Sequence, residues 1–342
     1  MKSRITAAVL FFAFLLFLIP ASAKEKPGTQ RKGLSKAAAG LPYVIMNANN
    51  VTSWVHSDGF FNWLVAQSWN GEYPRLSGVG TIFSEGIVFG GLVNDGLYSN
   101  TLRITGDTYQ VGMAPGAIHA DGTTDPVDAL SSRAFAVRPD MPPTAASKPE
   151  DWPNLTPDAA TYNQVPQASV TDGMVQSIAS QYFTDWKEWP AAKGAPWFID
   201  TVKQVRYDAA YDPNNPHCIP GIPGATKTAW FVCNDQDAAT TASFAGSPPL
   251  GIEEQMTLWA YASSTPLNNM VFKQVKLIYK GNPGSPANAS IDSMYVVQWA
   301  DPDNGDGGDD YAGCDSTLNL NYDWNSKTID AKYASVGLPA AA

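Results

Sequence analysis

The chain has 342 residues, and its 32 Asp and Glu side chains outnumber the 22 Lys and Arg side chains, which gives a formal net charge of -10. This acidic balance argues against nucleic acid as a partner, because nucleic-acid binding needs a basic surface. Hydrophobic residues make up 44% of the chain, enough for a sizeable core, and three cysteines are too few for a disulfide-rich scaffold.

Residues 1–23 have the three parts of a secretory signal peptide. Lys2 and Arg4 stand at the start, an apolar stretch follows over residues 7–19, and small residues at 21–23 match a cleavage site. The apolar stretch is shorter than the roughly 20 residues that a helix needs to cross a bilayer. We therefore expect a protein that is secreted or held at the cell surface, without a transmembrane anchor in the mature chain, and a disordered segment over residues 24–40.

Residues 41–137 are predicted to form a first β region. Runs of strand-forming residues lie at 80–83, 86–93 and 99–104, and Asn94-Asp95-Gly96 between the last two predicts a hairpin. A short helix is a further candidate over residues 58–67.

Residues 138–195 are predicted to be a proline-rich and partly helical connection. Within it, Met174, Ile178, Tyr182 and Trp186 recur every four residues, a spacing typical of one amphipathic helix, with Thr171 or Asp172 as its N-cap.

Residues 196–330 are predicted to form an antiparallel β-sandwich, and residues 331–342 a C-terminal tail. Strands are expected near residues 197–206, 228–233, 251–262, 270–279, 293–299 and 317–324. Alternation places Ile252, Glu254 and Met256 on one face of the third of these strands. The third and fourth strands should be antiparallel neighbours joined by the polar turn at residues 263–269. The fold class expected for the whole chain is therefore mainly β, with one or two short helices.

Cys218 and Cys233 are predicted to form a disulfide. Export permits oxidation, and a bridge closing a loop of about 15 residues would contribute about 3 kcal/mol in the chain-entropy model. Cys314 would then be a buried small apolar residue. The alternative is that all three cysteines remain reduced.

The segment from residue 301 to residue 310 is the most distinctive chemical feature of the sequence. Its five carboxylates are Asp301, Asp303, Asp306, Asp309 and Asp310, and three glycines separate them. Crowded carboxylates raise one another's pKa unless a cation separates them, and Ca²⁺ prefers oxygen ligands. The spacing does not match an EF-hand loop. Two interpretations stay open: an irregular calcium-binding turn with these five residues as ligands, and a solvated acidic hairpin loop.

No motif predicts a catalytic residue. A glycosidase needs two carboxylates about 5 to 10 Å apart in a cleft. Glu253 and Glu254 are adjacent on a strand and therefore face opposite sides, while Glu85, Glu188 and Asp200 lie in unrelated segments. Serine-hydrolase and phosphate-loop motifs do not occur.

Tryptophans raise the alternative of a carbohydrate-binding surface, although aromatic side chains more often fill cores. The candidates are Trp54, Trp63, Trp69, Trp152, Trp186, Trp189 and Trp197.

Two blocks of sequence resemble a known group of proteins. Residues 81–93 with 109–116, and scattered pieces from 249 to 320 that include Gly313-Cys314-Asp315-Ser316-Thr317-Leu318, are similar to large exported proteins of unknown function from the Bacteroidota and Ignavibacteria. The resemblance implies a cell-surface or released protein, often carried by type IX secretion, and implies no reaction. Members of that group extend well past the position that matches Ala342, so we expect this chain to be the front part of a longer protein or a truncated product.

These observations together predict an exported structural or binding protein without catalytic activity, with Ca²⁺ as its stabilising ion if the calcium-binding interpretation of the acidic loop holds. A glycan or another cell-surface component is the expected partner. The alternatives are a secreted glycan-active hydrolase and a free-standing carbohydrate-binding module.

Overall fold

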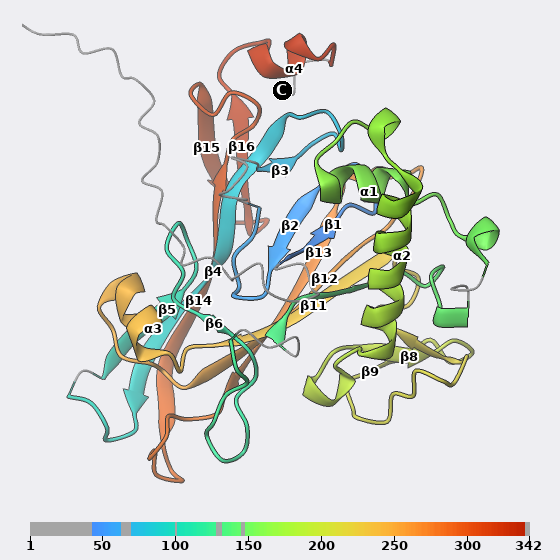
Figure 1. Cartoon of the computed structure of the whole chain (residues 1–342). Helices are drawn as coiled ribbons and strands as arrows, with labels where there is room; N and C mark the ends of the chain where they lie inside the picture. The colour runs from blue at the N-terminus through green and yellow to red at the C-terminus, as the bar shows by residue number, and fades with distance from the viewer. Residues whose placement is uncertain (1–42, 63–69, 100, 128–131, 145–147, 339–342) are drawn as a thin grey trace, which may run out of the picture.

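The computed structural model describes residues 43–62, 70–99, 101–127, 132–144 and 148–338. The predicted signal peptide, residues 24–40 and part of the short helix considered at 58–67 lie outside these ranges. The described part is mainly β and is built from antiparallel sheets with four α-helices, which confirms the predicted fold class. Figure 1 shows long strands through the centre of the molecule and two helices, α1 and α2, on one side.

The first large sheet centres on strand β11 (Lys227–Asn234). On one edge β11 pairs with β12 (Ile252–Ala260), which in turn pairs with β13 (Val271–Tyr279). On the other edge it pairs with the short strands β6 (Ala114–Pro115) and β7 (Phe135–Val137). The predicted pairing of β12 with β13 is confirmed over the full length of both strands.

The second large sheet centres on β4 (Gly80–Asn94), one continuous strand where the sequence predicted two. It pairs with β14 (Ser290–Pro302), β3 (Gly71–Glu72) and β5 (Leu102–Gly106). The predicted hairpin after residue 93 is confirmed, with Asn94-Asp95-Gly96 at the start of the β4–β5 connection. Strands from residues 41–137 and from residues 196–330 therefore pair with one another in both large sheets.

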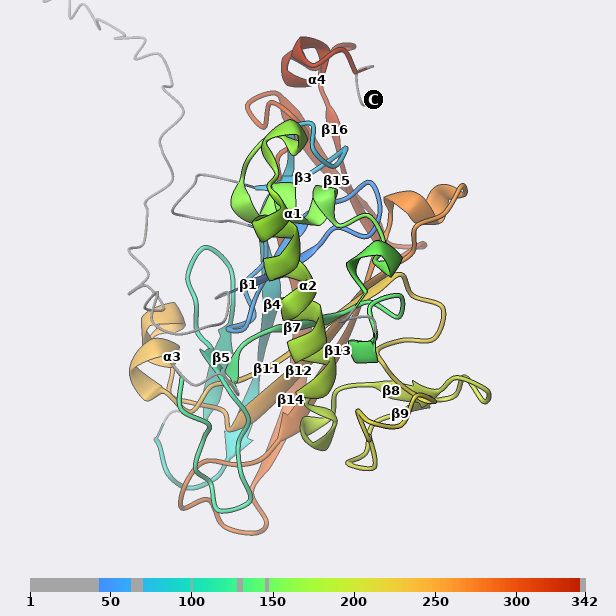
Figure 2. The ribbon, with the colours of Figure 1, turned by 45° about the vertical axis from the view of Figure 1, so that its right-hand side comes forward.

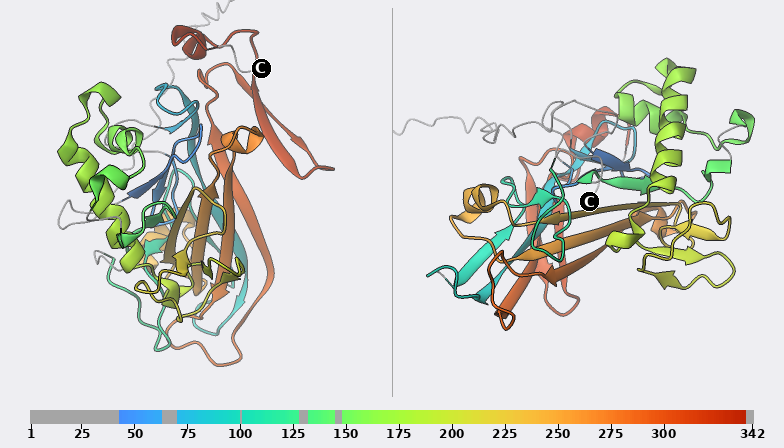
Figure 3. Two further views of the ribbon diagram at one scale, coloured as in Figure 1. Left: turned by 90° about the vertical axis from the view of Figure 1, so that its right-hand side faces the viewer. Right: turned by 60° about the horizontal axis from the view of Figure 1, so that its bottom comes forward.

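Three smaller antiparallel units complete the strands. They are the hairpin of β1 (Tyr43–Met46) and β2 (Ser53–His56), the sheet of β8 (Trp197–Ile199), β9 (Val205–Arg206) and β10 (Cys218–Pro220), and the hairpin of β15 (Asp310–Asp315) and β16 (Leu320–Asn325). The β15–β16 hairpin lies at one end of the molecule and projects from its body (Figure 3).

Helix α2 (Asp172–Lys187) forms where the apolar spacing predicted it, and the Thr171 side chain caps it by accepting a hydrogen bond from the Met174 N–H. Figure 2 shows α2 lying across β7, β11 and β12. The structure adds α1 (Thr156–Asn163), α3 (Ala238–Ala245) and the short α4 (Ala331–Ser335). None of the described helices is long and apolar enough to span a membrane.

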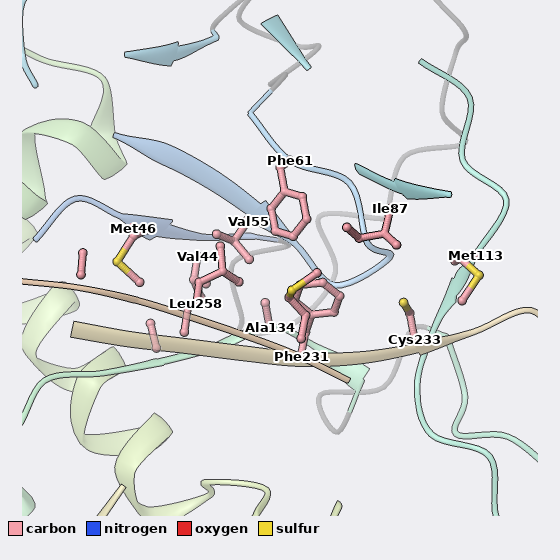
Figure 4. Close-up of a cluster of buried hydrophobic side chains, with 14 of the residues drawn as sticks. Val44, Met46, Val55, Phe61, Ile87, Met113, Ala134, Phe231, Cys233 and Leu258 are labelled. Atoms are coloured by element: carbon pink, nitrogen blue, oxygen red, sulfur yellow. The ribbon is translucent and has the colours of Figure 1, made fainter. Parts of the chain in front are cut away.

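The main core lies between the β1–β2 hairpin and the sheet that contains β11 and β12. Figure 4 shows Val44, Val55 and Phe61 from the β1–β2 layer facing Phe231 of β11 and Leu258 of β12. Burial removes these side chains from water, and each contributes roughly 1.5 to 3 kcal/mol to folding. A second cluster covers the opposite face of β11 and includes Trp189, Trp197 and Trp230.

The predicted disulfide is not formed: Cys218 and Cys233 are both free and buried. Neighbouring residues on a strand point to opposite faces, so Cys233 lies in the main core while Val232 lies in the second cluster, where Cys218 also packs. The prediction for Cys314 was also wrong, because this residue is exposed on β15.

Because the structure has no Cys218–Cys233 bridge, reduction should leave the thermal midpoint of the purified protein unchanged. The measurement is a melting curve with and without a reductant such as dithiothreitol. A bridge worth about 3 kcal/mol would instead be lost on reduction and lower the midpoint by several degrees, and that result would contradict the structure.

Candidate functional site

A cavity with a volume of about 450 Å³ opens between β2, β4, β13 and the end of β16. Its polar lining includes Ser53, Asn62, Glu85, Lys273 and Asp323. These residues are far apart in the sequence, and the antiparallel pairing of the strands brings them together. The cavity is of the size that takes a small ligand and combines apolar walls with a few convergent polar groups.

The Glu85 carboxylate is the central polar group of this cavity, and its side chain is only 9% exposed. Its Oε1 accepts a hydrogen bond from Asn62 Nδ2 at 2.7 Å, and its Oε2 accepts one from Gln298 Nε2 at 3.2 Å. The Lys273 ammonium lies 2.5 Å from the same Oε2. Both oxygens are engaged, so this carboxylate is held in one orientation by three donors.

Two buried polar atoms in the cavity wall have no hydrogen-bond partner among the described residues: Ser53 Oγ and Asn62 Oδ1. Their residues are 4% and 1% exposed. Buried polar groups are nearly always paired, because leaving one unpaired costs about 1 to 3 kcal/mol. Ser53 and Asn62 thus line the cavity, and each carries a buried polar atom that other described residues leave without a hydrogen bond.

Asn62 packs tightly against the backbone of Gly71 in the wall of the cavity. Asn62 has a left-handed backbone with φ of 71°. A Cβ on Gly71 would come within 2.9 Å of the Asn62 side chain, so only glycine allows Asn62 to occupy its position. The local backbone thus supports the orientation of the amide toward Glu85.

Asp323 contributes a second carboxyl group to the cavity from β16. Burial raises its pKa, and its Oδ2 has no hydrogen-bond partner among the described residues. This side chain differs from Glu85 in that it forms no salt bridge with a Lys or Arg of the described residues. Sequence reasoning did not single out Asp323, since only the folding of the β15–β16 hairpin next to β4 brings it to the cavity.

The other carboxylates considered for hydrolysis do not join Glu85. Glu188 pairs with Arg133 at 3.0 Å, and Asp200 pairs with His217 at 3.1 Å. Glu253 and Glu254 face opposite sides of β12, as predicted. Glu254 points into the main core, while Glu253 accepts hydrogen bonds from the Ile118 amide and Gln255 on the other face.

The five aspartates of the acidic loop are distributed over several contacts. Asp301 accepts a hydrogen bond from the Tyr109 hydroxyl at 2.6 Å, Asp309 pairs with Lys327 at 2.8 Å, and Asp310 accepts one from the Asn304 amide at 2.7 Å. Asp303 packs against Gly307, where a Cβ would come within 2.1 Å of its Oδ1, and the Asp306 amide donates to Asp330.

Two residues missed in the sequence, Asp323 and Asp330, lie near the same loop. Burial raises the pKa of Asp310, and the negative charges of Asp323, Asp309 and Asp330 raise it further. Within the ranges that the structure describes, no group of three or more His, Cys, Asp or Glu side chains is arranged to hold a metal ion. The calcium site therefore stays a prediction.

The tryptophans proposed as a sugar-binding platform are mostly in cores. Trp54, Trp186, Trp189 and Trp197 are buried, Trp152 is partly buried, and Trp63 and Trp69 lie outside the described residues. A different aromatic group is exposed on one face of the β15–β16 hairpin. It consists of Tyr311, Tyr322 and Trp324, whose rings lie 5.5 to 5.8 Å apart. Strand alternation places this aromatic face opposite to Asp323.

Glu254 should make stability depend on pH. The residue is fully buried, neither oxygen has a hydrogen-bond partner among the described residues, and burial raises its pKa to about 8 from an ordinary value of 4.5. Because the pKa of Glu254 is higher in the folded state than in the unfolded state, its protonated form contributes to the free energy of unfolding. This contribution is complete below pH 4.5 and is lost as the pH rises through about 8. We expect the free energy of unfolding to fall by a few kcal/mol across that window.

The measurement is denaturant unfolding of wild type, Glu254→Gln and the exposed control Glu188→Gln between pH 6.5 and 8. This range lies above the pKa values of about 6 to which burial raises Asp185 and Asp235. Glu254→Gln should flatten the slope, whereas Glu188→Gln should retain it. An unchanged slope in Glu254→Gln would show that Glu254 is not the group responsible.

Comparison with known proteins gives no family. No protein-family model matches the chain, and no curated protein and no solved structure is similar enough to count as a match. The function therefore has to be argued from the geometry of the site.

Proposed function

We propose that this chain is an exported binding protein that takes up a small polyhydroxylated ligand, of the carbohydrate type, in the Glu85 cavity. The observation that carries the proposal is that two residues lining the cavity, Ser53 and Asn62, each have a buried polar atom, Ser53 Oγ and Asn62 Oδ1, without a hydrogen-bond partner among the described residues. Sugar hydroxyls both donate and accept hydrogen bonds, so they satisfy a hydroxyl and an amide oxygen together. The apolar part of the lining suits the carbon-bound face of a sugar ring.

The arrangement of Glu85 favours binding over hydrolysis. A general acid must carry a proton on one carboxyl oxygen and deliver it to the ligand. Glu85 instead accepts contacts from Asn62, Gln298 and Lys273 on its two oxygens. A carboxylate held in this way can accept a hydrogen bond from a ligand hydroxyl in a fixed orientation.

Asp323 keeps hydrolysis as the second candidate function. It lines the same cavity, and burial raises its pKa, as a general acid requires. Glycosidase activity of the wild type on a panel of chromogenic glycosides, abolished in Asp323→Asn, would favour hydrolysis. Binding of sugar without turnover, retained in Asp323→Asn, would favour the binding protein.

Ser53→Ala is the sharpest test of the ligand site. Removing an unpartnered buried hydroxyl should leave the free protein at least as stable as wild type, because no hydrogen bond is lost and an unpaired polar group is removed. The affinity for a bound sugar should fall about fivefold, because one hydrogen bond of about 1 kcal/mol is lost. The measurement is calorimetric titration with a panel of neutral monosaccharides and oligosaccharides, beside melting curves of each variant.

Two control variants locate the binding. Ser243→Ala changes an exposed serine on α3 and should bind as wild type does. Trp324→Ala removes a ring from the aromatic face of the β15–β16 hairpin and should also bind normally. If Trp324→Ala loses binding while Ser53→Ala retains it, the ligand occupies the aromatic face, and the assignment to the Glu85 cavity is wrong.

We also propose that Ca²⁺ stabilises the acidic loop. Support comes from burial and the neighbouring negative charges, which raise the pKa of Asp310, and from buried oxygens of Asp309, Asp310 and Asp323 that have no hydrogen-bond partner among the described residues. A bound cation would offset the repulsion by its charge and take these oxygens as ligands.

A cation that binds only the folded state raises stability by mass action. The thermal midpoint should therefore be higher in about 1 mM Ca²⁺ than in a chelator, by several degrees if the dissociation constant is about 10 μM. Asp310→Asn should reduce this difference, whereas Asp200→Asn, a change on an exposed carboxylate in another segment, should not. Equal midpoints with Ca²⁺ and chelator would remove the calcium proposal.

A further inference from the structure

A second cavity, of about 280 Å³, differs from the Glu85 cavity in the sign of its charge. Arg75, Arg138 and Lys227 line it, together with one carboxylate, Asp158. Three cations around one anion is an unusual grouping in a chain whose formal net charge is -10. The cations come from the β3–β4 loop, the segment after β7 and the first residue of β11, so the fold brings them together.

The carboxylate of Asp158 is fully occupied by neighbouring groups. Its Oδ1 accepts a hydrogen bond from Asn47 Nδ2 at 3.0 Å, and its Oδ2 accepts one from the Tyr182 hydroxyl. Arg138 Nη1 lies 3.4 Å and Lys227 Nζ 3.8 Å from the same Oδ2. The side chain is 4% exposed, so these contacts compensate its negative charge, and the three cations leave the cavity with a positive charge overall.

Lys227 supplies a buried positive charge behind the cavity wall. Its side chain is 1% exposed, and Nζ donates a hydrogen bond to Asn47 Oδ1 at 2.9 Å. Burial, together with the charges of the nearby Arg138 and Arg75, lowers its pKa to about 8, against the opposing effect of Asp158 and Asp185. Repulsion among these three cations is the stress that an added anion would relieve.

The Arg75 guanidinium has N–H donors that bond to no other described residue. Its Nη1 donates to the Asn47 carbonyl at 2.5 Å, and its guanidinium forms no ion pair with any carboxylate of the described residues. Arg138 differs, because its Nε and Nη2 donate to the exposed Asp140 at 3.0 and 2.8 Å. A planar guanidinium matches the paired oxygens of a phosphate or carboxylate group.

We propose that this cavity binds a small oxyanion, with Arg75 as its direct ligand and with Arg138 and Lys227 providing the surrounding positive charge. The proposal is independent of sugar binding in the Glu85 cavity, because it depends on different residues and on the opposite charge. The competing explanation is that the three cations serve only to hold Asp158, and thereby α1, against β11.

The experiment is calorimetric titration of the full chain with sodium phosphate and, separately, with sodium malonate, against sodium chloride at matched ionic strength. We expect saturable binding of at least one of the two oxyanions. Binding of phosphate alone identifies a phosphate group as the ligand chemistry, and binding of malonate alone identifies a carboxylate. Absence of saturable binding of both up to about 10 mM, equivalent to about 2.7 kcal/mol, would overturn the proposal.

Arg75→Gln should weaken binding about tenfold or more, because it removes the only guanidinium of the three cations that lacks a carboxylate partner. Arg206→Gln, which changes an exposed arginine paired with Asp208 near β9, is the matched control and should bind as wild type does. Arg75→Lys keeps the charge without the planar fork and should bind with intermediate affinity. Equal weakening by Arg75→Gln and Arg206→Gln would mean that the anion is attracted only by overall charge.

The dependence on pH gives a readout that a purely structural role of the cations would not produce. Affinity for the bound oxyanion should fall as the pH rises through about 8 and Lys227 loses its proton. Malonate is the cleaner probe, because it is dianionic throughout this range, whereas phosphate itself still titrates between about pH 7 and 8. Binding that stays constant to pH 9.5 in a protein whose melting curve shows it folded would contradict the role given to Lys227.

Discussion

Strand β11 imposes the constraint on which the rest of the structure depends, because all eight of its residues are buried. Its alternating side chains enter two different cores, with Ala229 and Phe231 in the main core and Trp230 and Val232 in the second cluster. A strand buried on both faces needs a layer on each side. The β1–β2 hairpin, β4 and α2 cover one face, and the segment from Trp189 through β10 covers the other. The positions of these elements follow from the need to exclude water from both faces.

The β1–β2 turn and the loop after β3 contribute residues to both cavities. The β1–β2 turn gives Asn47 to the basic cavity and Thr52 to the Glu85 cavity, while the loop after β3 gives Arg75 to the first and Tyr73 to the second. The turn itself is tied to the β12–β13 connection, since Asn49 Nδ2 donates to the carbonyls of Leu267 and Met270. Walls fixed in this way need little ordering when a ligand arrives, which lowers the entropic cost of binding. Two neighbouring loops thus support two sites of opposite charge.

Local patterns predicted the elements whose own residues decide their structure. The four-residue spacing gave α2 with its Thr171 cap, and alternation placed Ile252, Glu254 and Met256 on one face of β12. Helix α3 escaped notice because its alanines and threonines have no amphipathic spacing, although Asp237 before it is a good N-cap. The pairing of β4 with β14 joins residues about 200 positions apart, and no local pattern encodes such a register. The Glu85 cavity depends on that register and on the β12–β13 pairing, so Glu85 could be named from sequence but its contacts with Lys273 and Gln298 could not.

The chain uses different means to bury carboxyl groups, and the comparison bears on function. Asp158 is surrounded by cations, Asp235 accepts hydrogen bonds from the amides of Leu250, Gly251 and Ile252, and Glu254 is held neutral by its proton at pH values below about 8. None of these three groups lines the Glu85 cavity.

Catalysis by acid and base needs a titrating group that reaches the ligand. In the Glu85 cavity, Glu85 itself is fixed by three contacts, and Asp323 is the lining carboxyl group whose pKa is shifted by burial. A hydrolytic mechanism would require Asp323 to act against a second carboxylate that is already engaged with a lysine and two amides. A binding site requires only that the groups stay where they are, and the contacts of Glu85 favour that outcome.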